Sequence, residues 1–346
     1  MRRVTKLLLL PLLLIAVLTG CGATAGDAAG GNPTVGGISI DRDGKELSVD
    51  LQGHVTAVGP TIWFQRRRVV ASPDGRWRAV VRRGPWGDEK TATVAIGPRG
   101  TNAPLQVVER HLSGENARIA WSPDSRWLAL TMFTGSTTSA VIVGTDGRRR
   151  VLARSFCGDM FSGFAWAPTG DRLAISEGRS GIGCAMADLD LSVRGADGSG
   201  GVIARRVRGV PSWSPDGHWL ALSGTRTEVM RPDGSQRRRV GGSGAAAWST
   251  RGTLLAFAGR YPDDALRVGS PGGALSSRER GVGEGPDPRF SPDGSLLAYQ
   301  SGSDLVIRRV SDRSLVVRVH LDDFVFVDNL AWSSDGRSLL FDASSA

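Results

Sequence analysis

The chain has 346 residues, including 47 glycines and 17 prolines, and its formal net charge is +9. This length suits two ordinary domains or one large repetitive domain, and a hydrophobic content of 40% excludes a disordered chain. The glycine and proline content favours many tight turns over long helices, and apart from one apolar run at the N-terminus nothing is long enough for a membrane span. The composition therefore predicts an exported, turn-rich, all-β protein.

The first 20 residues are typical of an export signal. Residues 1–6 carry three basic side chains, and residues 7–18 are apolar apart from Pro11, a stretch too short to span a bilayer stably. The stretch ends in Leu18-Thr19-Gly20-Cys21, which resembles the lipobox of bacterial lipoproteins. An ordinary secretory signal with a chance cysteine is the alternative.

The lipobox resemblance implies a location. Cys21 becomes the lipidated first residue once residues 1–20 are removed, and residues 21–36 form a flexible tether. We expect the protein to be anchored by its lipid to the outer face of the bacterial cytoplasmic membrane. Its positive charge is dispersed along the chain, so nucleic acid is not an expected partner, whereas anionic envelope polymers and lipid head groups remain open.

After the tether, residues 37–51 alternate in apolar character and contain an Asp43-Gly44 pair. Alternation with period two is typical of half-buried strands, and Asp-Gly is a common hairpin turn. The segment therefore predicts two strands joined at Asp43-Gly44.

A seven-fold repeat occupies most of the remaining chain. Its unit is an aromatic residue followed by Ser-Pro-Asp-Gly and, two residues later, by an apolar strand, and the spacing between units is 35 to 50 residues. The serine position falls at residues 72, 122, 167, 214, 249, 291 and 333. Proline presets φ, and glycine accepts the left-handed conformation that a type I turn with a bulge requires. Each unit therefore predicts a hairpin between two strands.

This repeated hairpin resembles that of the TolB-like, WD-repeat-like β-propeller family, and the resemblance covers residues 37–346. The unit departs from the family pattern at Ala71, Ser125, Thr169 and Thr250-Arg251. The resemblance implies an all-β fold, a seven-bladed β-propeller of four-stranded antiparallel blades. The seventh unit leaves room for only two strands, so we expect residues 37–51 to complete the last blade from the N-terminal side.

Eight tryptophans occupy repeat positions, where we expect them to fill the space between blades, whereas Trp86 falls outside the repeat. In a propeller the loops between second and third strands share one face, on which function usually depends. Trp86, Phe133 and Tyr261 lie in such loops and are the candidate ligand-binding residues. A loop side chain folded onto its own blade is the alternative for Trp86.

Cys157 and Cys184 form an even pair once Cys21 is lipidated, and an exported protein meets an oxidising environment. Both flank the third repeat in loops of the same face, which predicts a disulfide between them, with free thiols as the alternative. Arginine runs at residues 148–150 and 237–239 follow Asp-Gly turns, so we expect them on outer edge strands, where charge prevents edge-to-edge aggregation.

Sequence signatures of catalysis are absent. The chain contains neither Gly-x-Ser-x-Gly nor His-Glu-x-x-His, its four histidines are scattered, and the turn-like segments at Asp41 and Asp197 lack the further ligands of a calcium loop. We therefore expect no catalytic residue, metal or cofactor. The leading hypothesis is a monomeric, membrane-anchored adaptor that binds an envelope protein, peptide or glycan. The alternative is a glycan hydrolase or lyase whose carboxylates converge on the propeller channel from different blades.

Overall fold

The computed structural model divides the chain into two units, Met1–Gly31 and Asn32–Ala346. The structure describes residues 34–345, apart from 37, 41–43, 61–66, 84–91, 102–104, 113–117, 135–136, 156–162, 179–188, 225–226, 242–243, 260–264, 280–287 and 323–324. Every regular element in these ranges is a β-strand. The described residues contain no helix that is long and apolar enough to cross a membrane.

Seven four-stranded antiparallel sheets account for nearly all of the described residues, and we number them by the chain order of their innermost strands. The first consists of β5 (Arg67–Ala71), β6 (Trp77–Arg83), β7 (Ala92–Pro98) and β8 (Gln106–Leu112). The second consists of β9 (Ile119–Trp121), β10 (Trp127–Thr134), β11 (Thr137–Gly144) and β12 (Arg149–Ser155). The third consists of β13 (Gly163–Trp166), β14 (Arg172–Gly178), β15 (Leu189–Gly195) and β16 (Gly200–Val207).

The remaining sheets follow the same plan. The fourth consists of β17 (Val210–Trp213), β18 (Leu220–Ser223), β19 (Thr227–Met230) and β20 (Arg238–Gly241). The fifth consists of β21 (Gly244–Trp248), β22 (Leu255–Gly259), β23 (Leu266–Gly269) and β24 (Leu275–Glu279). The sixth consists of β25 (Arg289–Phe290), β26 (Leu296–Ser301), β27 (Asp304–Arg309) and β28 (Leu315–His320). The seventh has the order β29 (Val325–Trp332), β30 (Ser338–Ser345), β3 (Lys45–Asp50) and β4 (Val55–Pro60).

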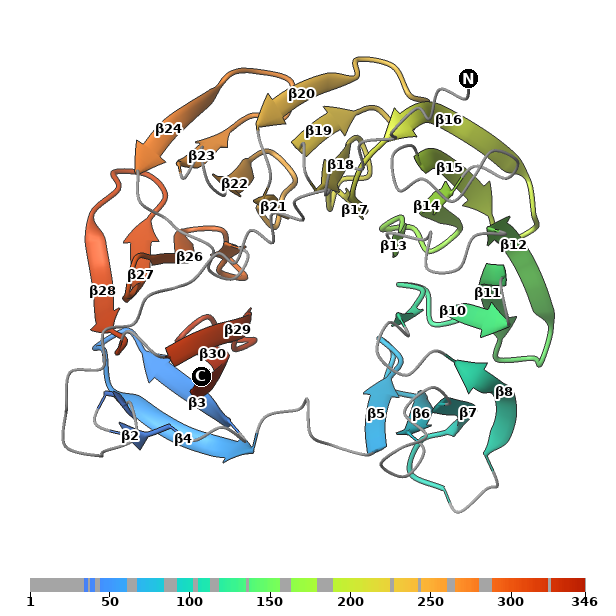
Figure 1. Ribbon diagram of the computed structural model, residues 1–346, viewed down its shortest axis with the longest axis horizontal. Helices are drawn as coiled ribbons and strands as arrows, with labels where there is room; N and C mark the ends of the chain where they lie inside the picture. The colour runs from blue at the N-terminus through green and yellow to red at the C-terminus, as the bar shows by residue number, and fades with distance from the viewer. Residues whose placement is uncertain are drawn as a thin grey trace, which may run out of the picture. The chain divides into compact units, whose positions relative to one another are not determined.

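Within the unit Asn32–Ala346 the sheets stand around a central axis, with the first strand of each sheet nearest to it and the fourth at the rim (Figure 1). This arrangement confirms the all-β propeller predicted from the sequence. Each of the seven repeats supplies the hairpin between the first two strands of one sheet, as expected. Seven four-stranded sheets among the described residues support a blade count of seven, which stays a prediction.

The repeat turn is held by one serine hydroxyl and one aspartate. In the first repeat the Ser72 hydroxyl donates to Asp74 Oδ1 at 2.6 Å and accepts the Trp77 amide at 2.9 Å, while Asp74 Oδ1 also accepts the Arg76 amide at 3.0 Å. The same three bonds recur at Ser122, Ser214, Ser291 and Ser333. Gly75, at the turn's left-handed position, has a φ of 71°. The turn chemistry therefore explains the composition of the repeat.

The repeat tryptophans join successive sheets by hydrogen bonds as well as by packing. Each of four indole N–H groups donates to a backbone carbonyl on the innermost strand of the preceding sheet. These pairs are Trp121 to Val70, Trp166 to Ala120, Trp213 to Ala165 and Trp332 to Arg289, at 3.0 to 3.1 Å. In the fifth sheet Trp248 donates instead to the Ser212 hydroxyl at 3.1 Å. The predicted role of these tryptophans between blades is confirmed, and each also satisfies a carbonyl of its neighbour.

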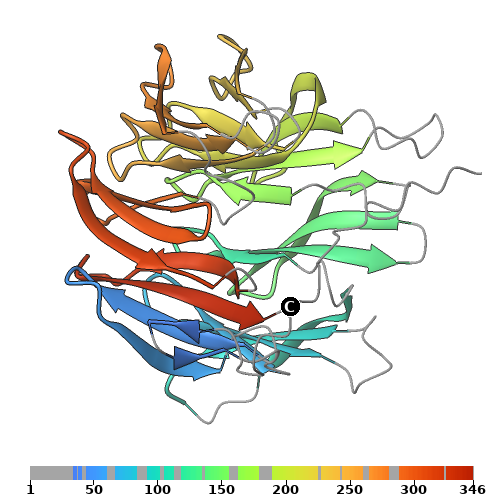
Figure 2. The same cartoon turned by 60° about the vertical axis from the view of Figure 1, so that its left-hand side comes forward.

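Both ends of the described chain build the seventh sheet, as predicted (Figure 2). The predicted turn is wrong, however. The donated hairpin is β3–β4 and turns at residues 51–54, one strand later than Asp43-Gly44. Asp50 explains the turn, because its Oδ1 accepts the amides of Gln52 and His54, both at 2.9 Å, and Gly53 has a φ of 90°.

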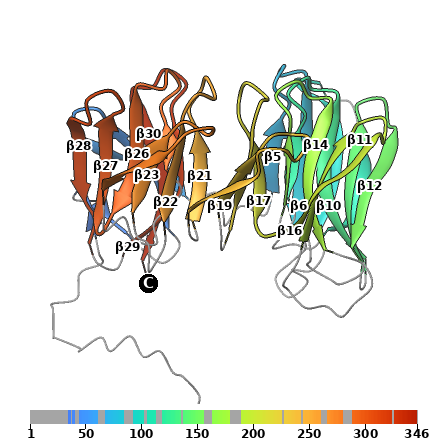
Figure 3. The same cartoon turned by 90° about the horizontal axis from the view of Figure 1, so that it is seen from above.

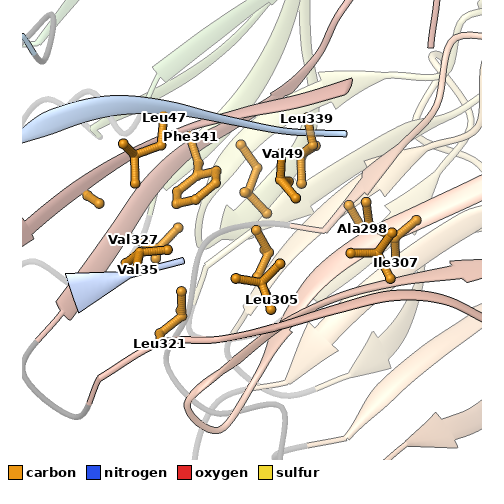
Figure 4. Close-up of a cluster of buried hydrophobic side chains, with 14 of the residues drawn as sticks. Val35, Leu47, Val49, Ala298, Leu305, Ile307, Leu321, Val327, Leu339 and Phe341 are labelled. Carbon is orange, nitrogen blue, oxygen red and sulfur yellow. The ribbon is translucent and has the colours of Figure 1, made fainter. Parts of the chain in front are cut away.

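The residues before β3 form a separate two-stranded sheet, β1 (Thr34–Val35) with β2 (Ile38–Ser39). Val35 is fully buried and forms a bridge to Leu321, so the last residues assigned to the tether belong to the folded unit. They contribute to a core between the sixth and seventh sheets, with Leu47 and Phe341 (Figure 4).

The arginine runs lie on outer strands, as predicted, but they also connect sheets. Arg150 Nη1 donates to the carbonyl of Asp197 in the third sheet at 2.7 Å. Arg238 donates from Nε to the Pro271 carbonyl of the fifth sheet at 3.1 Å, and from Nη2 to the Gly273 carbonyl at 2.5 Å. The guanidinium groups therefore satisfy backbone carbonyls across the sheet boundaries at the rim.

Candidate functional site

The meander order gives the ring two chemically different faces. Strands run between these faces, so the loops from second to third strands and the connections between sheets share one face, which we call the loop face (Figure 3). The repeat turns and the turns between third and fourth strands share the other, the turn face. The candidate loops after β6, β10 and β22 all leave their strands at the loop face.

Most of the site residues predicted from the sequence lie outside the described residues, namely Cys21, Trp86, Cys157, Cys184 and Tyr261. Phe133 belongs to β10, where its backbone pairs with Thr138, and its side chain is not described. The joint role of the three aromatic candidates therefore stays a prediction.

The disulfide also stays a prediction, although the strand ends around it are described. The segment with Cys157 leads into β13, and the segment with Cys184 follows β14. Gly163 at the start of β13 is paired with Ser176 near the end of β14. The segment with Cys157 therefore starts at the end of β12 in the second sheet and ends beside β14, the strand that the segment with Cys184 follows.

The innermost strands bear on the rival enzyme hypothesis. Their residue ranges contain one carboxylate residue, Asp328 of β29, and no histidine, cysteine or glutamate. Val69 of β5 is 53% exposed, and Asn329 and Ala331 of β29 are also exposed. Asn329 Nδ2 donates to Asp342 Oδ2 at 2.7 Å. The described residues of the innermost strands are therefore mostly apolar, and they include the charged Arg289 of β25, whose Nε donates to the Leu330 carbonyl at 3.2 Å.

Sequence reasoning missed a pair of carboxylates in the third sheet, of which Asp190 is buried and Glu177 is partly buried. Glu177 of β14 lies directly opposite Asp190 of β15, and their neighbours on the same face include Ser192 and Arg194. Arg194 Nη2 is 3.9 Å from Glu177 Oε1. Burial raises the pKa of Glu177, with Asp190 adding to the rise and with Ser192 and Arg194 opposing it. The available signal was a charged residue in a strand whose same-face neighbours are apolar.

The surroundings of this pair are those of a packed interface. Leu173 and Ile175, which precede Glu177 on the same face of β14, pack with Ile142 of the second sheet. Cross-strand neighbours have Cβ atoms about 4.5–5.5 Å apart, so Asp190 is close enough to add to the raised pKa of Glu177. The pair thus lies within sheet packing.

Among the described residues, no group of three or more histidine, cysteine, aspartate or glutamate side chains is placed to hold a metal ion. The segment at Asp197 is a plain turn, because its Oδ1 accepts the amide of Ser199 at 2.9 Å and the hydroxyl of Ser199 at 2.6 Å. The corresponding segment at Asp41 lies outside the described residues.

The order of strands and the two faces define a β-propeller, and the chain was also compared with known proteins. No protein-family model matches the sequence, and no curated protein matches it. Among solved structures, TolB from Acinetobacter baumannii is 14% identical with a TM-score of 0.43, and the match covers 89% of this chain and 65% of that chain. A putative 6-phosphogluconolactonase from Bacteroides uniformis is 13% identical with a TM-score of 0.48, covering 79% and 94%.

A third structure, a eukaryotic initiation factor, is 12% identical with a TM-score of 0.43, and the match covers 66% of this chain and 57% of that chain. The chain therefore spans less than two thirds of the TolB and initiation-factor chains. At these identities the likeness concerns the fold alone. The order of strands in the sheets confirms the fold that the TolB-like resemblance implied.

Proposed function

We propose that the chain is a membrane-anchored lipoprotein of the bacterial cell envelope, whose propeller is a non-enzymatic adaptor that binds a protein, peptide or glycan at its loop face. The anchor is inferred from Leu18-Thr19-Gly20-Cys21, and the binding face from the aromatic residues of the second-to-third-strand loops. The observation that supports binding over catalysis is the single carboxylate, Asp328, in the seven innermost strands.

Hydrolysis of a glycan places a specific demand on the channel. Glycoside hydrolases generally use two carboxylates, about 5 Å apart in retaining enzymes and about 6.5–9.5 Å apart in inverting ones. The innermost strands supply one, Asp328, and its cross-strand partner on β30 is Asp342, whose Oδ2 accepts the Asn329 side-chain amide at 2.7 Å. The aspartates of the repeats, such as Asp74 and Asp293, lie at the turn face, where serine hydroxyls and backbone amides occupy them.

The envelope hydrolase or lyase remains the second candidate because of Glu177 and Asp190. Their cross-strand pairing and the raised pKa of Glu177 are features of a carboxylate pair that divides acid and base roles. A Glu177→Gln variant removes the titratable group with little change in shape. If the chain cleaves envelope glycan and this variant does not, the enzyme replaces the adaptor as the function.

Photo-crosslinking in intact cells tests the binding face. A crosslinking residue at position 86 on the loop face is compared with one at Arg337, an exposed residue of the turn face. We expect a discrete adduct from position 86 that is absent from position 337. Equal adducts from both positions, or none from position 86, would contradict a partner at the loop face.

Replacement of Cys21 tests the anchor separately. If Cys21 accepts the lipid, a Cys21→Ala variant accumulates as unprocessed precursor, visible as slower migration on a denaturing gel and loss of labelling by a fatty-acid analogue. Normal processing of the variant would contradict the lipoprotein assignment and leave the binding face untouched.

A further inference from the structure

A pocket of about 350 Å³ lies between the fifth and sixth sheets. One wall consists of Leu266 and Val268 of β23, and the opposite wall consists of Leu297 and Tyr299 of β26. All four side chains belong to the core shared by the two sheets. The rim is formed at the turn that joins β27 to β28, so the pocket lies at the turn face, opposite the proposed partner-binding face.

The pocket lies beside a position that varies among the repeats. The residue five positions after the repeat serine is tryptophan in the first, second and fourth sheets, arginine in the third, leucine in the fifth (Leu254) and sixth, and serine in the seventh. Two of these tryptophans lie against the turn between the third and fourth strands of the next sheet. Trp127 of the second sheet packs in the same cluster as Ala196 of the third. Trp219 of the fourth sheet lies against Gly272 of the fifth.

Val310 of the sixth sheet corresponds to Ala196 of the third. In each sheet the amide of this residue donates to the carbonyl of the residue just before the second strand: Val310 donates to Ser295, and Ala196 donates to Asp171. Val310 lines the pocket. At the boundary of the second and third sheets Trp127 packs in the same cluster as this position, whereas the fifth sheet carries the smaller Leu254 where the second carries Trp127. We therefore infer that the smaller side chain leaves room beside Val310 that an indole would fill.

A tyrosine and an arginine give the apolar pocket a fixed polar end. The position of Tyr299 is a hydrocarbon side chain in every other repeat. Tyr299 is 1% exposed, and its hydroxyl oxygen accepts a bond from Arg308 Nε at 2.9 Å. Arg308 Nη1 donates to the Arg313 carbonyl at 3.1 Å. These two bonds hold the guanidinium in one orientation at the pocket before any ligand arrives.

The charge of the lining is wholly positive. Arg309 and Arg313 are exposed and line the pocket together with Arg308, and no carboxylate is among the described lining residues. Asp312 is the nearest acid along the turn, and its Oδ1 accepts the amide and hydroxyl of Ser314 at 2.9 and 2.8 Å. The lining thus combines hydrocarbon walls with a surplus of positive charge.

We propose that this pocket is a second binding site, for a small amphipathic carboxylate whose hydrocarbon part lies between β23 and β26 and whose anionic group meets the arginines of the β27–β28 turn. The aliphatic walls account for the hydrocarbon part. The planar guanidinium groups account for the carboxylate, which they can bind by two parallel N–H···O bonds. This site is independent of the partner proposed for the loop face.

Calorimetric titration with octanoate tests the proposal, using the chain as purified in a nonionic detergent. We expect saturable binding of one octanoate per chain, at least tenfold weaker binding of octan-1-ol, which lacks the charge, and none of acetate, which lacks the hydrocarbon. Equal affinity for octanoate and octan-1-ol would overturn recognition of the anion. Absence of octanoate binding would overturn the site.

Leu254→Trp is the decisive variant, because it restores the residue that three other repeats carry and fills the pocket. We expect it to keep or raise the melting temperature while octanoate binding falls at least tenfold. Arg309→Ala combined with Arg313→Ala should weaken octanoate about tenfold and leave octan-1-ol unchanged. Arg337→Ala removes a positive charge elsewhere on the turn face, so it should change neither the affinity for octanoate nor the affinity for octan-1-ol. Wild-type affinity in a folded Leu254→Trp variant would show that octanoate binds elsewhere and that the proposal is wrong.

Discussion

Ser125 shows how one residue can depart from the repeat without loss of the turn. Six repeats place glycine at the left-handed position, and Ser125 takes the same conformation with a φ of 63°. This conformation costs an L-residue about 1–2 kcal/mol. The Ser125 hydroxyl, which is nearly buried, accepts the amide of Asp74 in the preceding sheet at 3.0 Å. The strain of one turn is thus offset by a bond between two turns.

Two substitutions at Ser125 separate these effects. Ser125→Ala keeps the strained backbone and loses the bond, so we expect a loss of about 1 kcal/mol in the free energy of unfolding. Ser125→Gly also loses the bond but relieves the strain, so it should be more stable than Ser125→Ala by about 1 kcal/mol. Urea midpoints of the two variants and the wild type measure the difference. A less stable glycine variant would contradict the account.

The repeat aspartates predict an acid dependence of stability. The hydroxyls of Ser291 and Ser295 and the Ser295 amide lower the pKa of Asp293 from 3.8 to about 2, and hydrogen bonds from Ser72 and Ser333 likewise lower the pKa values of Asp74 and Asp335. A carboxyl with a lower pKa in the folded state stabilises that state above its unfolded pKa. This contribution is lost as the pH falls from about 4 to about 2.

Asp293→Asn tests the dependence at one turn, because it removes the charge and keeps the size of the side chain. The melting temperature of the wild type should exceed that of the variant at pH 5, and the difference should shrink as the pH falls toward 2. A difference that stays constant across this range would show that the ionised carboxylate contributes nothing to the turn.

At the scale of the element, a hydrogen bond from the indole N–H of a repeat tryptophan joins the innermost strand of one sheet to that of the preceding sheet. Trp166→Phe keeps the aromatic packing and leaves the Ala120 carbonyl without its indole donor, so we expect a loss of about 1–2 kcal/mol. Trp248→Phe is the matched control, because its acceptor is the Ser212 hydroxyl, which can rotate to another partner. Urea unfolding of both variants provides the comparison. Equal losses would mean that packing alone joins the sheets.

The strands and turns could be predicted because their causes are local. Ser-Pro-Asp-Gly determines its own turn through bonds within five residues, so seven copies identify seven hairpins. The donated hairpin was misplaced because Asp43-Gly44 and Asp50-Leu51-Gln52-Gly53 are both plausible turns, and only pairing of β3 with β30 decides between them. That choice depends on contacts almost 300 residues apart.

The site features that the sequence did not reveal depend on contacts between strands or between sheets. Glu177 and Asp190 are 13 residues apart, and only the register of β14 and β15 places them opposite each other. The pocket between the fifth and sixth sheets is lined by residues of both, among them Val268, Tyr299 and Arg308, so it depends on the packing of one sheet against the other. The repeat pattern alone does not specify that packing.

At the scale of the whole molecule, the ring is closed by noncovalent pairing of segments from opposite ends of the chain. Strand β3 pairs with β30 from Lys45↔Ala343 to Asp50↔Ser338, and Leu47 and Val49 are fully buried against the sixth and seventh sheets. Val35 and Ile40 enter the same core. Burial of a side chain of this size contributes about 1.5–3 kcal/mol, so the four together can hold the N-terminal segment in place without a covalent link.

Cleavage between β4 and β5 tests this closure. With a protease site introduced within residues 61–66, the cleaved N-terminal fragment should remain bound to the rest of the chain on size-exclusion chromatography and separate only in denaturant. Leu47→Asp buries a charge in the shared core, so the fragments of that variant should separate in native buffer. Val58→Asp is the control, because Val58 lies on the outermost strand β4 and is 54% exposed. If the wild-type fragments separate without denaturant, pairing of β3 with β30 does not close the ring.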